Sequence, residues 1–160
     1  MSAAEYTFQA TPEMAQAGAR RLMGRRAGRA MLFFYLVIGG CACLLIAGNR
    51  HWPLFVGPAV SIWFILQWRA YCRKAAEPYA AMSDPTTRIV VEDDGISMVT
   101  VDRSSKMKWS LVKEVWRYPD LWLIFFYSDA HYTILSTDGM SDYIATKIAD
   151  EVTAAGGTVR

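Results

Sequence analysis

Hydrophobic and polar positions divide the chain into stretches with different periods. Residues 30–47 and 52–68 are almost continuously apolar, residues 88–135 alternate between apolar and polar positions, and residues 141–155 repeat apolar positions every three or four residues. Long apolar runs are typical of membrane-spanning helices, period two of half-buried strands, and period 3.6 of amphipathic helices. The pattern predicts a helical hairpin, a small antiparallel sheet and a C-terminal helix.

The run 30–47 carries no charge and would extend about 27 Å as a helix, close to the thickness of the hydrocarbon layer. A secretory signal peptide is the competing interpretation, but its apolar region is normally shorter and nearer the start. The run 52–68 is bracketed by Trp52 and Trp68, whose rings favour the headgroup level. Because residues 48–51 allow only a tight reversal, we expect a two-span transmembrane hairpin.

Small residues recur at helical spacing along both predicted spans, where they would allow close approach of helices in lipid. They are Gly39, Cys43, Ala47, Gly57 and Ser61. The stripe predicts packing either within the hairpin of one chain or between two copies in a homo-oligomer.

Basic residues lie on one side of the predicted hairpin. They are Arg20, Arg21, Arg25, Arg26, Arg29, Arg69, Arg73 and Lys74, with only Arg50 in the connecting loop. This asymmetry predicts that both termini face the cytoplasm of a bacterial inner membrane, and that the cluster contacts anionic lipid. Without interleaved aromatic residues, it does not indicate a nucleic-acid partner.

Composition agrees with a folded membrane protein, since apolar residues make up 53% of the chain and charged residues 20%, with a net charge of +2. The three cysteines indicate no disulfide. Cys41 and Cys43 would point about 200° apart on a helix, so we expect apolar filler and no metal site. Cys72 lies beside Arg73 and Lys74, which favours its thiolate or palmitoylation, although an unmodified thiol is the preferred interpretation.

The segment before the first span predicts a short strand and a helix. Residues 6–10 alternate weakly, and Thr11-Pro12-Glu13 is a good helix start. We expect residues 7–10 to pair with the cytoplasmic sheet, the alternative being a frayed terminus. After the second span, residues 75–85 are interpreted as a linker that contains Pro78 and Pro85.

The C-terminal part predicts an α+β domain in which one helix covers an open sheet or a partly closed barrel. A tight turn at residues 93–95 joins its first two strands. Residues 121–127 are apolar on both faces and should form the central strand. The predicted core consists of Trp109, Val112, Val115, Leu123, Phe125, Ile144 and Ile148.

Candidate chemistry in this part is sparse. Asp93-Asp94-Gly95 lacks the later ligands of a calcium loop, and His51 and His131 would lie on opposite sides of the bilayer. No nucleophile–base pair or metal cluster is visible, so the chain is not expected to be an enzyme or to need a cofactor. An aromatic ligand cage of Trp109, Trp116 and Trp122 is the alternative to their burial in the core.

Several of these segments resemble the bacterial YcxB-like family. They are residues 95–96, residues 109–115, with Trp109, Val112 and Val115 as the most specific point, and residues 121–125. The resemblance implies a two-span hairpin followed by a small domain similar to pleckstrin-homology sheets, and it implies no catalytic residue. The basic residues that the family commonly has before its last helix are missing from residues 135–140 of this chain.

These observations divide the chain into an N-terminal segment (1–29), the hairpin (30–68), a linker (69–85) and a cytoplasmic domain (86–160). We expect a membrane-anchored interaction or scaffolding module that binds protein partners or itself. The alternative is a sensor of anionic lipid or membrane state that acts through the basic segments.

Overall fold

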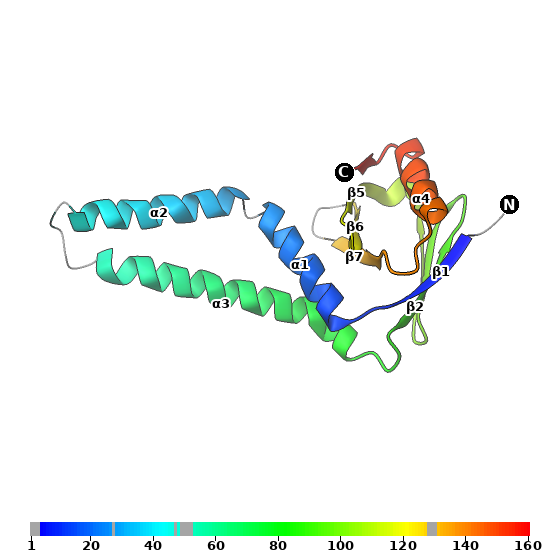
Figure 1. The fold of residues 1–160 in the computed structure, drawn as a ribbon, viewed down its shortest axis with the longest axis horizontal. Coiled ribbons are helices and arrows are strands. Elements are labelled where there is room, and N and C mark those ends of the chain that lie inside the picture. The colour runs from blue at the N-terminus through cyan, green and yellow to red at the C-terminus, as the bar shows by residue number, and fades with distance from the viewer. Residues whose placement is uncertain (1–3, 27, 47, 49–52, 128–130) are drawn as a thin grey trace.

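The computed structural model describes residues 4–26, 28–46, 48, 53–127 and 131–160. In chain order the elements are β1 (Ala4–Gln9), α1 (Pro12–Arg26), α2 (Gly28–Ile46), α3 (Pro53–Ala80), β2 (Thr86–Val91), β3 (Gly95–Val99), β4 (Ser104–Lys108), the 3-10 turn η1 (Trp109–Leu111), β5 (Val112–Arg117), β6 (Leu121–Phe126), β7 (His131–Ser136), α4 (Asp142–Ala154) and β8 (Thr158–Val159). Helices α2 and α3 lie side by side and project away from a body that contains the strands and α4 (Figure 1).

The strands form two sheets. The first has the order β1-β2-β3-β4 and the second the order β7-β6-β5-β8, and every pair is antiparallel except β5 with β8. The predicted turn between β2 and β3 is present, with the Glu92 amide donating to the Gly95 carbonyl at 2.9 Å. Gly95 also passes so close to β4 that a Cβ would lie 2.2 Å from the Met107 carbonyl oxygen. Only glycine allows this approach of the two strands.

Strand β1 pairs antiparallel with β2, from Ala4 opposite Val91 to Gln9 opposite Thr86. The predicted pairing of residues 7–10 with the sheet is therefore confirmed. Its alternation places Tyr6 and Phe8 in the core and leaves Thr7 exposed. Helices α1, α2 and α3 are thus inserted between two neighbouring strands of one sheet, and residues 86–160 alone lack its first strand.

The main core lies between the two sheets and α4. It contains Ile89, Val91, Ile96, Val115, Ile124, Leu135, Ile148 and Val152, all essentially without solvent contact. Helix α4 begins after Ser141, whose hydroxyl accepts from the Ile144 amide, so the predicted C-terminal helix is confirmed to within a residue at each end. The parallel strand β8 that follows it was not predicted, because two residues after a glycine pair are too short to show a period.

A second cluster covers the opposite face of the second sheet. Leu123, Phe125 and Ile134 point toward helices α1 and α3 and pack with Ala15, Leu22 and Ala76. Every residue of β6 is buried, because this strand is central in its sheet and is covered on both faces. The prediction of a central strand from its continuous apolar run is confirmed.

Helix α1 is held on this sheet by close packing and by its arginines. A Cβ on Gly18 would lie 2.7 Å from the Ile134 Cδ1 atom, so the absence of a side chain lets the helix approach. Arg21 pairs with Asp120 at 2.6 Å and lies over the Tyr118 ring. Arg25 lies 4.4 Å from the centre of the Trp116 ring. These arginines, predicted to lie at a membrane surface, contact the domain itself.

Within the described ranges, no helix combines the length and apolar character that crossing a bilayer requires. The predicted transmembrane hairpin and the multi-pass inner-membrane localisation are therefore wrong. The prediction that both termini face the cytoplasm depended on that hairpin and loses its basis. Residues 53–68 belong to a longer helix, α3, which continues through Arg69, Arg73 and Lys74. The fold is α+β, with two sheets and three helices inserted between the first two strands.

The linker and the helix-packing stripe also need correction. Helix α3 continues through Pro78 to Ala80, so only residues 81–85 connect it to β2. Where α2 meets α3, Gly57 faces Cys41, and a Cβ on Gly57 would lie 3.9 Å from the Cys41 Cβ atom. Cys43 is exposed and Gly39 has no neighbour of this kind, because these positions lie on the opposite side of α2 from Cys41. Ser61 donates to the Gly57 carbonyl at 2.8 Å, and Ala47 lies outside the described residues.

Stability should decline at alkaline pH because the Tyr6 phenol is buried and donates to the Ser136 carbonyl at 3.2 Å. Burial raises the pKa of Tyr6 above its ordinary value, which is about 10 in an unfolded chain. The free energy of unfolding should therefore be constant below about pH 10 and fall above it, by up to about 1.4 kcal/mol per pH unit for this group. Denaturant titrations from pH 8 to 11 measure the decline, and Tyr6→Phe should make it shallower; equal slopes would contradict the assignment.

Candidate functional site

The candidate site is a hollow between helices α1 and α3. The two helices pack together where Ala15, Ala19 and Ala76 allow close approach, and α1 then rises away from α3 (Figure 1). A hollow of about 290 Å³ opens beside this contact. Its lining residues are Gln16, Arg20, Trp68, Arg69, Cys72 and Arg73. We call this hollow the arginine groove.

Of the residues that the structure describes, three arginines and no carboxylate line the arginine groove. Within the described part of the chain, Arg69 and Arg73 make no ion pair, and Arg20 reaches only the Gln16 side-chain oxygen, at 3.4 Å. Several basic residues elsewhere are paired with carboxylates: Arg21 with Asp120, Arg88 with Glu5, Lys106 with Glu92 and Asp94, Lys147 with Asp93, and Arg160 with Glu114. The groove therefore holds positive charge that the described residues do not neutralise.

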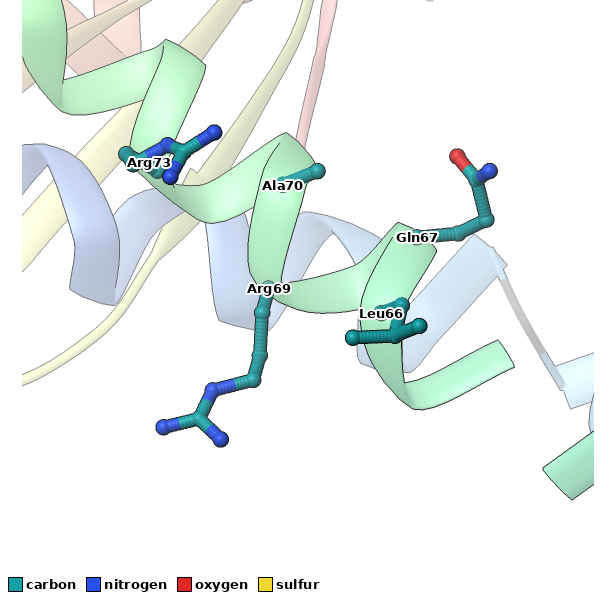
Figure 2. Close-up of a pocket in the computed structure, with 5 residues that line it drawn as sticks. All are labelled: Leu66, Gln67, Arg69, Ala70 and Arg73. Carbon is teal, nitrogen blue, oxygen red and sulfur yellow. The ribbon is translucent and has the colours of Figure 1, made fainter. Parts of the chain in front are cut away.

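A second hollow, of about 610 Å³, adjoins the same two arginines of α3. Its lining adds Leu66, Gln67 and Ala70 to Arg69 and Arg73. Figure 2 shows that all of these side chains come from one helix and that the Arg69 guanidinium extends away from it into open space. The second hollow is thus an open surface beside α3, and the convergence of charge from two helices occurs in the arginine groove.

The structure separates the eight basic residues that sequence analysis grouped together. Arg20, Arg69 and Arg73 line the arginine groove, whereas Arg21 and Arg25 fasten α1 to the second sheet. Lys74 is exposed outside both hollows. Nothing is described for the side chains of Arg26 and Arg29.

Gln16 and Trp68 complete the groove but were not singled out as site residues. The signal was present, since Gln16 with Arg20 and Arg69 with Arg73 have the spacing of four that places side chains on one helix face. The sequence does not reveal the angle and register at which α1 packs on α3, and these bring the two pairs together.

The residues predicted to form the core are all buried: Trp109, Val112, Val115, Leu123, Phe125, Ile144 and Ile148. Trp109 and Trp122 lie in the main core, and Trp116 lies in the second cluster. They therefore do not form a shared aromatic cage. Among the described residues there is no group of three potential metal ligands, while His51 lies outside the described residues.

The fold and its groove define a class: a small α+β domain of two antiparallel sheets closed by a C-terminal helix, with a helical insertion. Within it, residues 91–143 match the family model described as YcxB-like protein, so the resemblance found in the sequence is confirmed for this segment. The match runs from the end of β2 into α4 and leaves out β1 and the inserted helices. No curated protein and no solved structure matches the chain.

Proposed function

We propose that the protein is an interaction module that associates with a second copy of itself through the helices α2 and α3. The observation that supports this proposal is a set of large apolar side chains on these helices, each more than half exposed. They are Leu32, Tyr35, Leu36, Ile46, Phe55, Ile62, Trp63, Ile65 and Leu66. Large apolar side chains left exposed together on one pair of helices indicate a site of interaction.

The chemistry of this apolar surface favours an identical partner. Helix α2 carries no charge after Arg29, so a charged partner surface would gain nothing from it. Within one chain the two helices already meet through Phe34 and Phe64, whose rings are 5.3 Å apart, and their outer faces stay uncovered. A second helix pair offers the same apolar side chains and the same length, and two pairs can bury these faces as a four-helix bundle.

The exposed area is sufficient for a stable dimer. Buried aromatic side chains cover about 150–250 Å² each. With Tyr35, Phe55 and Trp63 more than half exposed, they offer roughly 400 Å² together, and the aliphatic residues contribute a similar area. The sum reaches the roughly 800 Å² per partner that standard interfaces bury.

Light scattering of the purified full chain tests the association. We expect a particle of twice the 18.0 kDa chain mass, and Leu36→Gln should weaken the dimer by roughly tenfold or more because it places an unpaired amide in an apolar interface. Val101→Gln is the matched control, since Val101 is equally exposed but lies between β3 and β4. A bismaleimide should also link Cys43, which is exposed on α2, and Cys43→Ser should abolish the product.

A single-chain mass at micromolar concentration, or equal effects of Leu36→Gln and Val101→Gln, would overturn self-association. Retention of the chain on vesicles of uncharged phosphatidylcholine in place of a dimer would assign the apolar surface to lipid and would also overturn it.

A further inference from the structure

We propose that the arginine groove binds a phosphomonoester group. The proposal goes beyond self-association and does not depend on it, because the groove lies at the contact of α1 with α3 and not on the outer faces of α2 and α3. It rests on three features of the groove: its charge, the arrangement of its donors and its size.

The charge favours an anion. Three arginines from two helices line one hollow, and among the described residues no carboxylate lines it. Like charges gathered at one place repel each other, so an anion bound among them is stabilised by all three at once. Arg21 on the same helix shows the contrast, because Asp120 neutralises it.

The donors favour phosphate over a carboxylate. Guanidinium groups present planar forks of N–H donors that match phosphate oxygens two at a time. A phosphomonoester has three terminal oxygens, whereas a carboxylate has two, and three arginines from two directions can surround the former. The Trp68 indole and the Gln16 amide add neutral donors to the lining of the groove.

The size favours a small group. A hollow of about 290 Å³ is at the lower end of the range for ligand pockets, which suits a phosphate and the first atoms of its ester but not a nucleotide. A free phosphomonoester and the headgroup of phosphatidic acid share this chemistry.

Two measurements on the full chain distinguish these sources. Isothermal titration with inorganic phosphate tests the free anion, and co-sedimentation with vesicles of phosphatidylcholine, with and without phosphatidic acid, tests the headgroup. Arg69→Gln and Arg73→Gln should each weaken binding by about 10-fold to 100-fold, since each removes charge-assisted hydrogen bonds. Arg73→Lys should weaken it less, because lysine keeps the charge but loses the fork.

Lys74→Gln is the matched control, because it removes the same charge from the next position of α3 outside both hollows. Unchanged melting temperatures would show that the variants remain folded. Saturable phosphate binding that survives Lys74→Gln and is lost in the arginine variants supports a free ligand, and the same pattern only with phosphatidic acid supports the headgroup. Absence of binding to both probes, or equal loss with Lys74→Gln, would overturn the proposal.

Discussion

Replacing Trp109 with alanine should lower the free energy of unfolding by about 3–5 kcal/mol. The residue lies in the 3-10 turn between β4 and β5, where the chain passes from the first sheet to the second. Its ring is only 4% exposed and belongs to the main core together with Ile144 and Ile148 of α4. Truncation leaves a cavity at the point where both sheets and the helix meet. Small domains have about 5–15 kcal/mol of stability in total, so much of it depends on this ring.

Two further variants divide the effect of Trp109 into its parts. The Trp109 Nε1–H donates to the Glu92 carbonyl at 3.0 Å, which ties the turn to the end of β2. Trp109→Phe keeps most of the apolar volume but leaves that carbonyl without its donor, and it should cost about 1–3 kcal/mol. Tyr143→Ala removes an exposed ring from α4 and should stay within about 0.5 kcal/mol of the parent. Urea titrations measure all three, and a parent-like midpoint for Trp109→Ala would contradict its place in the core.

The sequence predicted the elements whose pattern is local. The strand at residues 121–126 and the helix after Ser141 follow from an apolar run, a period of 3.6 and an N-cap, all of which are readable within a few residues. The pairing of β1 with β2 was also predicted, from alternation and from an otherwise open sheet edge, although the two strands are far apart in the chain.

The two apolar runs do form the neighbouring helices α2 and α3, but the prediction that these helices cross a membrane was wrong, and so was the end of the second helix at Trp68. Helix α3 does not stop at Trp68 but continues to Ala80, and its continuation carries two arginines of the groove. Basic residues that form one cluster in the sequence point in different directions in space, since α1 directs Arg21 and Arg25 at the sheet and Arg20 at α3. Neighbouring side chains on a helix point about 100° apart, so Arg20 and Arg21 face different partners. Which face of α1 meets the sheet and which meets α3 becomes visible only once the helix is packed in the structure.

Truncating the buried aromatic residues of β1 should have an effect as large as that of Trp109→Ala. Tyr6 and Phe8 are each about 95% buried and stack at 5.9 Å between ring centres. Phe8→Ala and Tyr6→Ala should each cost about 3–5 kcal/mol. Because the rings touch, their effects will not add simply, but the double variant should approach the whole stability of the domain. Thr7→Ala, on the exposed face between them, should cost less than about 1 kcal/mol.

Amide hydrogen exchange shows whether these losses act through the sheet. Without β1, strand β2 becomes an edge, so its amides should exchange faster in Phe8→Ala than in Thr7→Ala, while those of β6 follow global stability. The effect should also reach α1, because Ala10 donates to the Pro85 carbonyl at 2.8 Å and only Ala10 and Thr11 separate β1 from α1. Strand β1 therefore fixes one end of the inserted helices to the sheet as β2 fixes the other. If exchange along β2 is the same in Phe8→Ala and Thr7→Ala, β1 does not anchor the insertion.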